Sequence, residues 1–266
     1  MTPRPIPFTP MHQLYKDARK MGQKRRLGLA KRFVSEPEAL GAIFGTSVDA
    51  YRSGYENIGE PFHPKKNRKK LLPLLPGDDI ERGYDLTRIL AHGSRSWAIE
   101  GCPSATAFKF VDYEIAPLRT TGGAAFEGAK SGRGPVADLL LVAADGTPVI
   151  GEIKVATATR YDTDPVMALI QGLTLAATLA TPQQRERLAN HYPDRGFKTD
   201  GPLGLWVLSV KPPEPPKAKY QSCLAGAARD LADAIRNKPS ISAALRHLEF
   251  IEARWDGNGL RLIKGV

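Results

Sequence analysis

The stretch "VADLLLVAADGTPVIGEIKV", from Val136 to Val155, predicts a β-hairpin at the centre of the fold. Runs of strand-forming residues flank an Asp-Gly pair, and this dipeptide between two apolar runs is a strong sign of a tight turn. Both runs are mainly apolar, so we expect both strands to be buried. Asp138, Glu152 and Lys154 then need an explanation, because charged groups are costly to bury unless they are paired, hydrogen-bonded or bound to a metal.

The spacing of these three charges predicts that they meet at one point. Glu152 and Lys154 are two residues apart, so in a strand they point to the same face, about 7 Å from each other. Asp138 lies on the neighbouring strand, about 4.8 Å away, and approaches Glu152 if the register suits. Two close carboxylates repel unless a cation lies between them, and Mg²⁺ prefers carboxylate and water oxygens. These are the requirements of metal-assisted phosphodiester hydrolysis, whereas the alternative is an ion pair of Lys154 with a purely structural role.

Composition narrows the class of protein. A chain of 266 residues can bury a full core in one or two domains, and 42% apolar with 25% charged residues is typical of a globular protein. Cys102 and Cys223 have neither metal-ligand nor disulfide-scaffold spacing, and the histidines form no pair at ligand spacing. No Gly-rich phosphate loop is present, which argues against an ATP-driven motor. With no secretory leader pattern and no long apolar run, we expect a cytoplasmic protein with no membrane partner.

Positive charge is concentrated in the first third of the chain. The net charge is +10, and residues 1–75 hold fifteen lysines and arginines against six acidic residues. Such clusters suit a nucleic-acid backbone, although a solvated surface or an acidic protein partner explains them as well. Two basic clusters, Lys16–Arg26 and His63–Lys70, and a glycine-containing loop at Glu127–Gly134 that could equally be a solvated loop are expected to contact nucleic acid. The residues expected to make these contacts are Lys24, Arg25, Arg26, Lys65, Lys66, Arg68, Lys69, Lys70, Lys130 and Arg133.

Helix-capping residues and a loop rich in Pro, Gly and Lys predict a basic helical region at 1–78. They also predict a second domain at 79–266, whose core spans about 80–210. In the first region, Thr9 and Pro10 begin a helix that runs to about Phe33, and Ser35 with Glu38 forms a capping-box pattern for a short second helix. A loop rich in Pro, Gly and Lys follows. The remaining expected elements are a helix at 79–100, a strand at 108–118, the hairpin, a helix at 164–179, a strand at 204–210, a helix at 224–236 and a hairpin at 248–263.

Asp138, Glu152 and Lys154 match, in order and spacing, the motif of the PD-(D/E)XK nuclease superfamily, which this chain therefore resembles. The motif places an Asp on one core strand and, after a turn, Glu or Asp, any residue and Lys on the next; here Ala137 stands where the family name has Pro. The resemblance implies an α/β restriction-endonuclease-like core, a mixed central sheet flanked by helices. It also implies a Mg²⁺-dependent nuclease, with Mn²⁺ able to substitute, that acts on DNA through these three residues.

The resemblance further implies additional ligands around the metal. The backbone carbonyl of Ile153 is one, and a Glu on the helix before the first strand often joins it. Glu100 ends an apolar stripe on that expected helix, although a solvated Glu at a helix end is the plain alternative. Glu114, on the first strand, is the competing ligand or a neighbour of the ligands. Gln171 is expected beside the ligands too, although Leu175 follows it where some branches have Tyr.

Two questions stay open at this level. A nucleic-acid-binding or scaffold module that keeps the fold without catalysis is the alternative to a nuclease. The chain could also act as a homodimer or within a larger complex.

Overall fold

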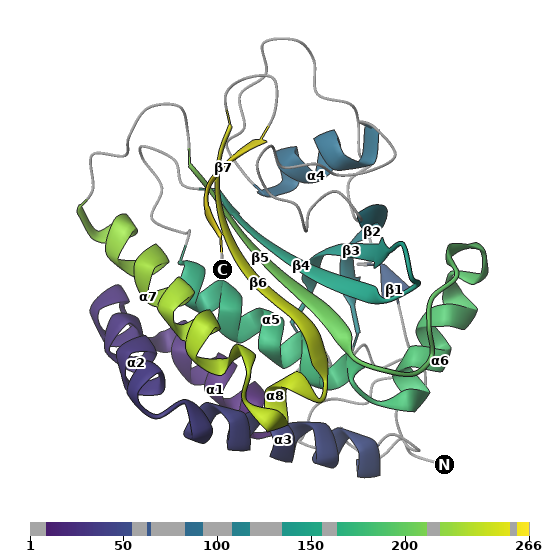
Figure 1. Ribbon diagram of the computed structural model, residues 1–266, viewed down its shortest axis with the longest axis horizontal. Coiled ribbons are helices and arrows are strands. Elements are labelled where there is room, and N and C mark those ends of the chain that lie inside the picture. The colour runs from purple at the N-terminus through teal and green to yellow at the C-terminus, as the bar shows by residue number, and fades with distance from the viewer. Residues whose placement is uncertain are drawn as a thin grey trace.

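The computed structural model describes most of the chain. The described residues fall in eight ranges: 9–54, 63–64, 83–92, 108–117, 135–155, 164–211, 219–255 and 260–265. Within them the protein is α/β, with one mixed sheet that has helices on both faces (Figure 1).

The sheet has seven strands in the described part of the chain, and their spatial order follows their order in sequence. The first four strands pair in antiparallel fashion, β4, β5 and β6 are parallel, and β7 returns antiparallel to β6. Their bounds are β1 His63–Pro64, β2 Phe108–Ala116, β3 Ala137–Ala143, β4 Pro148–Val155, β5 Leu203–Lys211, β6 Leu245–Trp255 and β7 Leu260–Gly265.

Helices make the crossovers that parallel strands require. The segment between β4 and β5 holds α5 and α6, and the segment between β5 and β6 holds α7 and α8. The helices are α1 Pro10–Lys20, α2 Gln23–Ser35, α3 Pro37–Gly54, α4 Gly83–His92, α5 Pro165–Leu179, α6 Pro182–His191, α7 Lys219–Arg236 and α8 Pro239–Ser242, with a short 3₁₀ turn at Pro193–Arg195.

The two faces of the sheet have separate apolar cores. On one face, α1, α2, α3, α5 and α7 pack together, and Figure 1 shows them as a layer beside the strands. Residues of α1 and α2 such as Met11 and Phe33 belong to the same buried cluster as Ile150 and Phe250 of the sheet. On the other face, Leu86 of α4 packs with strand residues of the opposite pleat.

The central hairpin forms as predicted. Four residues separate the two strands, and one of them, Gly146, adopts φ 85°, a left-handed conformation that favours glycine. The Asp145 carboxylate accepts a hydrogen bond from the Thr147 backbone N–H at 3.0 Å, which stabilises the turn. This turn fixes the register in which β3 pairs with β4.

The remaining predicted elements from strand β2 onward are confirmed, and two helices, α6 and the four-residue α8, were not predicted. The strand at 108–118, the helix at 164–179, the strand at 204–210, the helix at 224–236 and the final antiparallel hairpin correspond to β2, α5, β5, α7 and β6–β7. Helix α6 was not expected, because its polar sequence has no clear apolar stripe. The helix expected at 79–100 is described only over α4.

The amino-terminal helices differ from the prediction at two points. The helix expected from Pro10 to Phe33 is two helices, because the chain breaks at Met21 and Gly22, where Gly22 caps α2 in an extended conformation. The expected capping box is wrong: the Ser35 hydroxyl donates to the carbonyls of the preceding turn of α2, and α3 is eighteen residues long rather than short.

The basic amino-terminal helices share a core with the sheet, as described above. The expected boundary near residue 78 lies outside the described residues. Among the described helices, none is both long and apolar enough to cross a membrane alone, and α5 with α6 meets the length and composition test only as a pair bent by 92°.

Candidate active site

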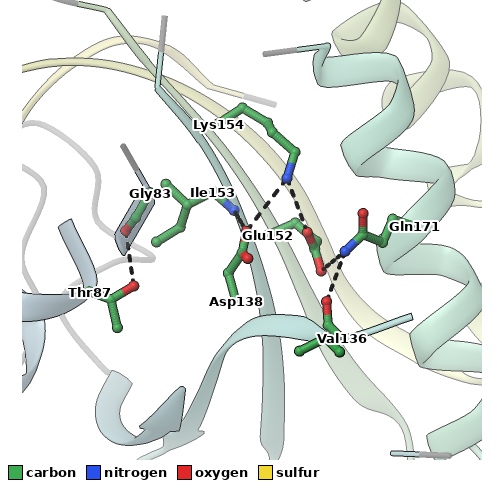
Figure 2. A network of polar contacts seen from close by, with 8 residues as sticks. All are labelled: Gly83, Thr87, Val136, Asp138, Glu152, Ile153, Lys154 and Gln171. Carbon is green, nitrogen blue, oxygen red and sulfur yellow. Dashed lines mark hydrogen bonds and ion pairs between the residues drawn. The ribbon is translucent and has the colours of Figure 1, made fainter. Parts of the chain in front are cut away.

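The predicted meeting of Asp138, Glu152 and Lys154 is present in the structure. The register pairs Leu139 with Gly151, and one step further along the two strands brings Asp138 opposite Glu152. Lys154 Nζ lies 3.6 Å from Asp138 Oδ2 and 3.4 Å from Glu152 Oε2 (Figure 2). The three charged groups therefore surround one point on the face of the sheet that α5 covers.

Asp138 is held by the backbone of the neighbouring strand. Its Oδ2 accepts a hydrogen bond from the Ile153 N–H at 2.8 Å (Figure 2). Ile153 lies beyond the last paired residues of β3 and β4, so this carboxylate accepts the bond that a backbone carbonyl of β3 would otherwise accept. The carbonyl oxygen of Ile153 lies beside Gly83 of α4, where an added Cβ would come within 3.3 Å of it. A glycine at this position leaves room beside that carbonyl.

Glu152 is held by α5. The Gln171 amide Nε2 donates to Glu152 Oε1 at 3.0 Å and to the Val136 carbonyl at 2.8 Å (Figure 2). Every residue of α5 except Gln171 is buried, and the partly exposed Gln171 side chain points to the site. The structure thus brings Gln171 into direct contact with Glu152.

Burial and neighbouring charges shift the pKa values of Glu152 and Lys154. Glu152 is fully buried, whereas the side chains of Asp138 and Lys154 are 32% and 19% exposed. Burial raises the pKa of the Glu152 carboxyl well above its usual range, and the charge of Asp138 raises it further, against the opposing effect of Lys154. Burial lowers the pKa of Lys154, but Asp138 and Glu152 outweigh it, so the pKa lies above its ordinary value. A divalent cation beside both carboxylates would favour their ionised forms.

The residues present fit Mg²⁺ better than a metal enclosed by protein ligands. No group of three His, Cys, Asp or Glu within the described ranges is arranged to hold a metal. Mg²⁺, however, usually keeps several waters and binds through one or two carboxylates plus substrate oxygens. Asp138, Glu152 and the carbonyl of Ile153 supply that kind of donor set.

Glu114 has an unusual backbone beside this site. It lies between the registered pairs Tyr113–Leu139 and Ile115–Ala137, and so opposite Asp138 on the other side of β3. Its φ of 45° is a left-handed conformation, which is uncommon for a residue other than glycine. Its carboxylate does not complete a group of three with Asp138 and Glu152.

The predicted phosphate contacts fall into three groups. Lys24 and Arg25 are exposed on the first turn of α2. Arg26 instead pairs at 3.1 Å with the buried Asp164, which caps α5 by accepting hydrogen bonds from the Val166 and Met167 N–H groups. Outside the described residues lie Lys65, Lys66, Arg68, Lys69, Lys70, Lys130 and Arg133, and so does Glu100, which was predicted as a metal ligand.

Tyr15 also belongs to the surroundings of this site, although no local pattern in the sequence indicates it. Burial raises the pKa of its hydroxyl, and the charges of Arg19, Glu152 and Lys154 act on that hydroxyl as well. Only the packing of α1 against α5 brings Tyr15 here.

Comparisons of the chain with protein-family models, with curated proteins and with solved structures find no match. The chemistry of the site is therefore inferred from its own geometry.

Proposed function

We propose that this protein is a metal-dependent nuclease with a restriction-endonuclease-like fold that hydrolyses phosphodiester bonds in DNA. One observation carries the proposal: Asp138, Glu152 and Lys154 converge at one point, with Lys154 Nζ within 3.6 Å of both carboxylates. The mixed sheet and the order of elements from α4 to β5 are compatible with this fold.

Each of these residues has a separate role in the proposed reaction. Asp138, Glu152 and the Ile153 carbonyl would hold Mg²⁺, which when bound lowers the pKa of water and offsets phosphate charge. Lys154 places a positive charge where negative charge develops on the phosphate, an effect that counts most in the transition state. Gln171 fixes the orientation of the Glu152 carboxylate by its hydrogen bond.

The burial of Glu152 argues against a module that only binds nucleic acid. An ionisable carboxyl that is 0% exposed and lies beside a second carboxylate destabilises the folded state at neutral pH. A surface that only binds phosphate does not require a buried carboxyl group. A metal-dependent reaction does require this carboxyl group, because Glu152 would bind the metal ion.

The experiment is a cleavage assay with Mg²⁺ or Mn²⁺ on plasmid, linear duplex, single-stranded DNA and RNA. Wild-type protein should cut DNA, and Glu152→Gln should lose cleavage by at least a hundredfold while it remains folded. Glu186→Gln is the matched control, because Glu186 is exposed on α6. Cleavage that survives in Glu152→Gln refutes the assignment, and binding without any cleavage supports the scaffold alternative.

A further inference from the structure

Helix α1 runs along α5 in the opposite direction and is fixed at two points. Near the start of α1, the carbonyl of Met11 accepts a hydrogen bond from Thr174 Oγ1 at 3.3 Å. Just beyond the end of α1, Arg26 pairs with Asp164 at the amino-terminal end of α5. These anchors place the middle of α1 beside the middle of α5, where Gln171 contacts Glu152.

Tyr15 and Arg19 lie between the two anchors and one helical turn apart. The guanidinium carbon of Arg19 is 5.7 Å from the centroid of the Tyr15 ring, a cation–π arrangement. The Tyr15 ring is half-buried and packs against the core, whereas Arg19 is exposed. Tyr15 therefore lies on the inner side of this pair and Arg19 on the side that faces solvent.

We propose that Tyr15 and Arg19 bind the phosphate backbone of the nucleic-acid substrate next to the phosphodiester that faces Asp138, Glu152 and Lys154. This inference rests on the proposed function. A guanidinium binds phosphate through two parallel hydrogen bonds, and an exposed arginine loses little hydration when it does so. The Tyr15 ring limits the orientations of Arg19 before the substrate arrives, which lowers the entropy cost of binding.

The ion pair of Arg26 with Asp164 has a structural role. Because its side chain is 19% exposed and already paired, Arg26 secures the corner between α1 and α2 at the end of α5. Arg19, by contrast, is exposed on α1. A purely structural Tyr15–Arg19 pair would instead stabilise the helix slightly and leave binding unchanged.

The test measures the affinity for fluorescently labelled duplex DNA, and for RNA of the same sequence, in the full-length Glu152→Gln protein. Arg19→Ala should weaken binding about tenfold and lower the salt dependence of affinity by about one unit of log–log slope. Arg19→Lys should lie in between, because it keeps the charge but loses the paired hydrogen bonds. Tyr15→Phe keeps the ring beside Arg19 but removes the hydroxyl with which Tyr15 would bind phosphate, so it should weaken binding severalfold while the melting temperature stays unchanged.

Arg32→Ala is the matched control. Arg32 is also an exposed arginine over a neighbouring aromatic ring, at 5.9 Å from the centroid of Phe33, but it pairs with Glu36 at the far end of α2. Its loss should change affinity by less than twofold. Equal effects of Arg19→Ala and Arg32→Ala, or no binding of either nucleic acid by the parent protein, overturn the inference.

Phosphate binding by Tyr15 and Arg19 and the nuclease assignment can be refuted independently. Binding that depends on Arg19, in a protein whose wild type cuts nothing, supports phosphate binding here and refutes the nuclease assignment. In a wild-type background that does cut, Arg19→Ala should raise KM about tenfold and leave kcat within twofold. Cleavage with an unchanged KM in Arg19→Ala refutes this inference alone.

Discussion

Gln171 fixes the position of Glu152: one amide nitrogen donates to the Glu152 carboxylate at 3.0 Å and to the Val136 carbonyl at 2.8 Å. Because Val136 immediately precedes β3, the amide ties the strand that carries Asp138 to the strand that carries Glu152. Gln171→Leu should reduce Mn²⁺ affinity by about ten- to a hundredfold, as is typical when a neighbour of a metal ligand is lost, and slow cleavage with it.

The control for Gln171→Leu is Gln184→Leu. Gln184 is buried and, like Gln171, donates to a backbone carbonyl, that of Pro117, but from α6. Its substitution should lower stability without a change in metal affinity. Similar metal affinities in the two variants would show that Gln171 is only a structural residue.

Lys154 should act in turnover more than in binding. Its ammonium lies between the two carboxylates, so Lys154→Ala should bind DNA and metal almost normally and cut at least a hundredfold more slowly, about 3 kcal/mol in barrier. Lys154→Met separates this role from a structural ion pair, because it keeps the apolar stem. A well-folded Lys154→Met protein with normal turnover would remove Lys154 from the mechanism.

Asp138 and Glu152 together should account for metal binding. We expect calorimetry to detect Mn²⁺ bound by the wild type, and Asp138→Asn combined with Glu152→Gln to abolish it. Asp145→Asn is the control, since Asp145 lies in the hairpin turn and pairs with Lys198. If the double variant binds Mn²⁺ as the wild type does, the metal site has been placed wrongly.

The pair of Arg26 with Asp164 should contribute to stability. Asp164 is buried, so Arg26→Ala leaves a carboxylate with its cation removed and should cost on the order of 3 kcal/mol in unfolding free energy. Asp164→Asn keeps an oxygen for the cap of α5, so the two variants and their combination form a double-mutant cycle in urea. Additive losses would show that the two residues are not coupled.

His12 should make the protein less stable in acid. Burial, with a contribution from Lys16, lowers the pKa of His12 from 6.5 to about 4. Between these pH values the unfolded chain binds more protons than the folded one, so the unfolding free energy should fall by about 3 kcal/mol from pH 7 to pH 4. His12→Gln should flatten this dependence in urea unfolding, whereas His191→Gln, at an exposed position on α6, should not.

The hairpin and its charges could be predicted from the sequence because their geometry is local. A glycine-containing turn and two apolar runs determine which residues of β3 and β4 face one another, and strand alternation puts Glu152 and Lys154 on one face. Asp138 therefore meets Glu152 within a segment of twenty residues. Gln171 was expected beside the ligands only through the motif resemblance, and the structure places its amide nitrogen 3.0 Å from the Glu152 carboxylate.

Other features depended on contacts between segments far apart in the chain. The break at Gly22 directs α2 onto α7, and α1 lies along α5 because their apolar faces are buried in one shared core. Tyr15 reaches the surroundings of the site only through this packing, across more than a hundred residues of sequence, with Arg19 beside its ring. Local propensity determined the elements and the charged centre, whereas burial of apolar surface between distant helices decided which side chains surround that centre.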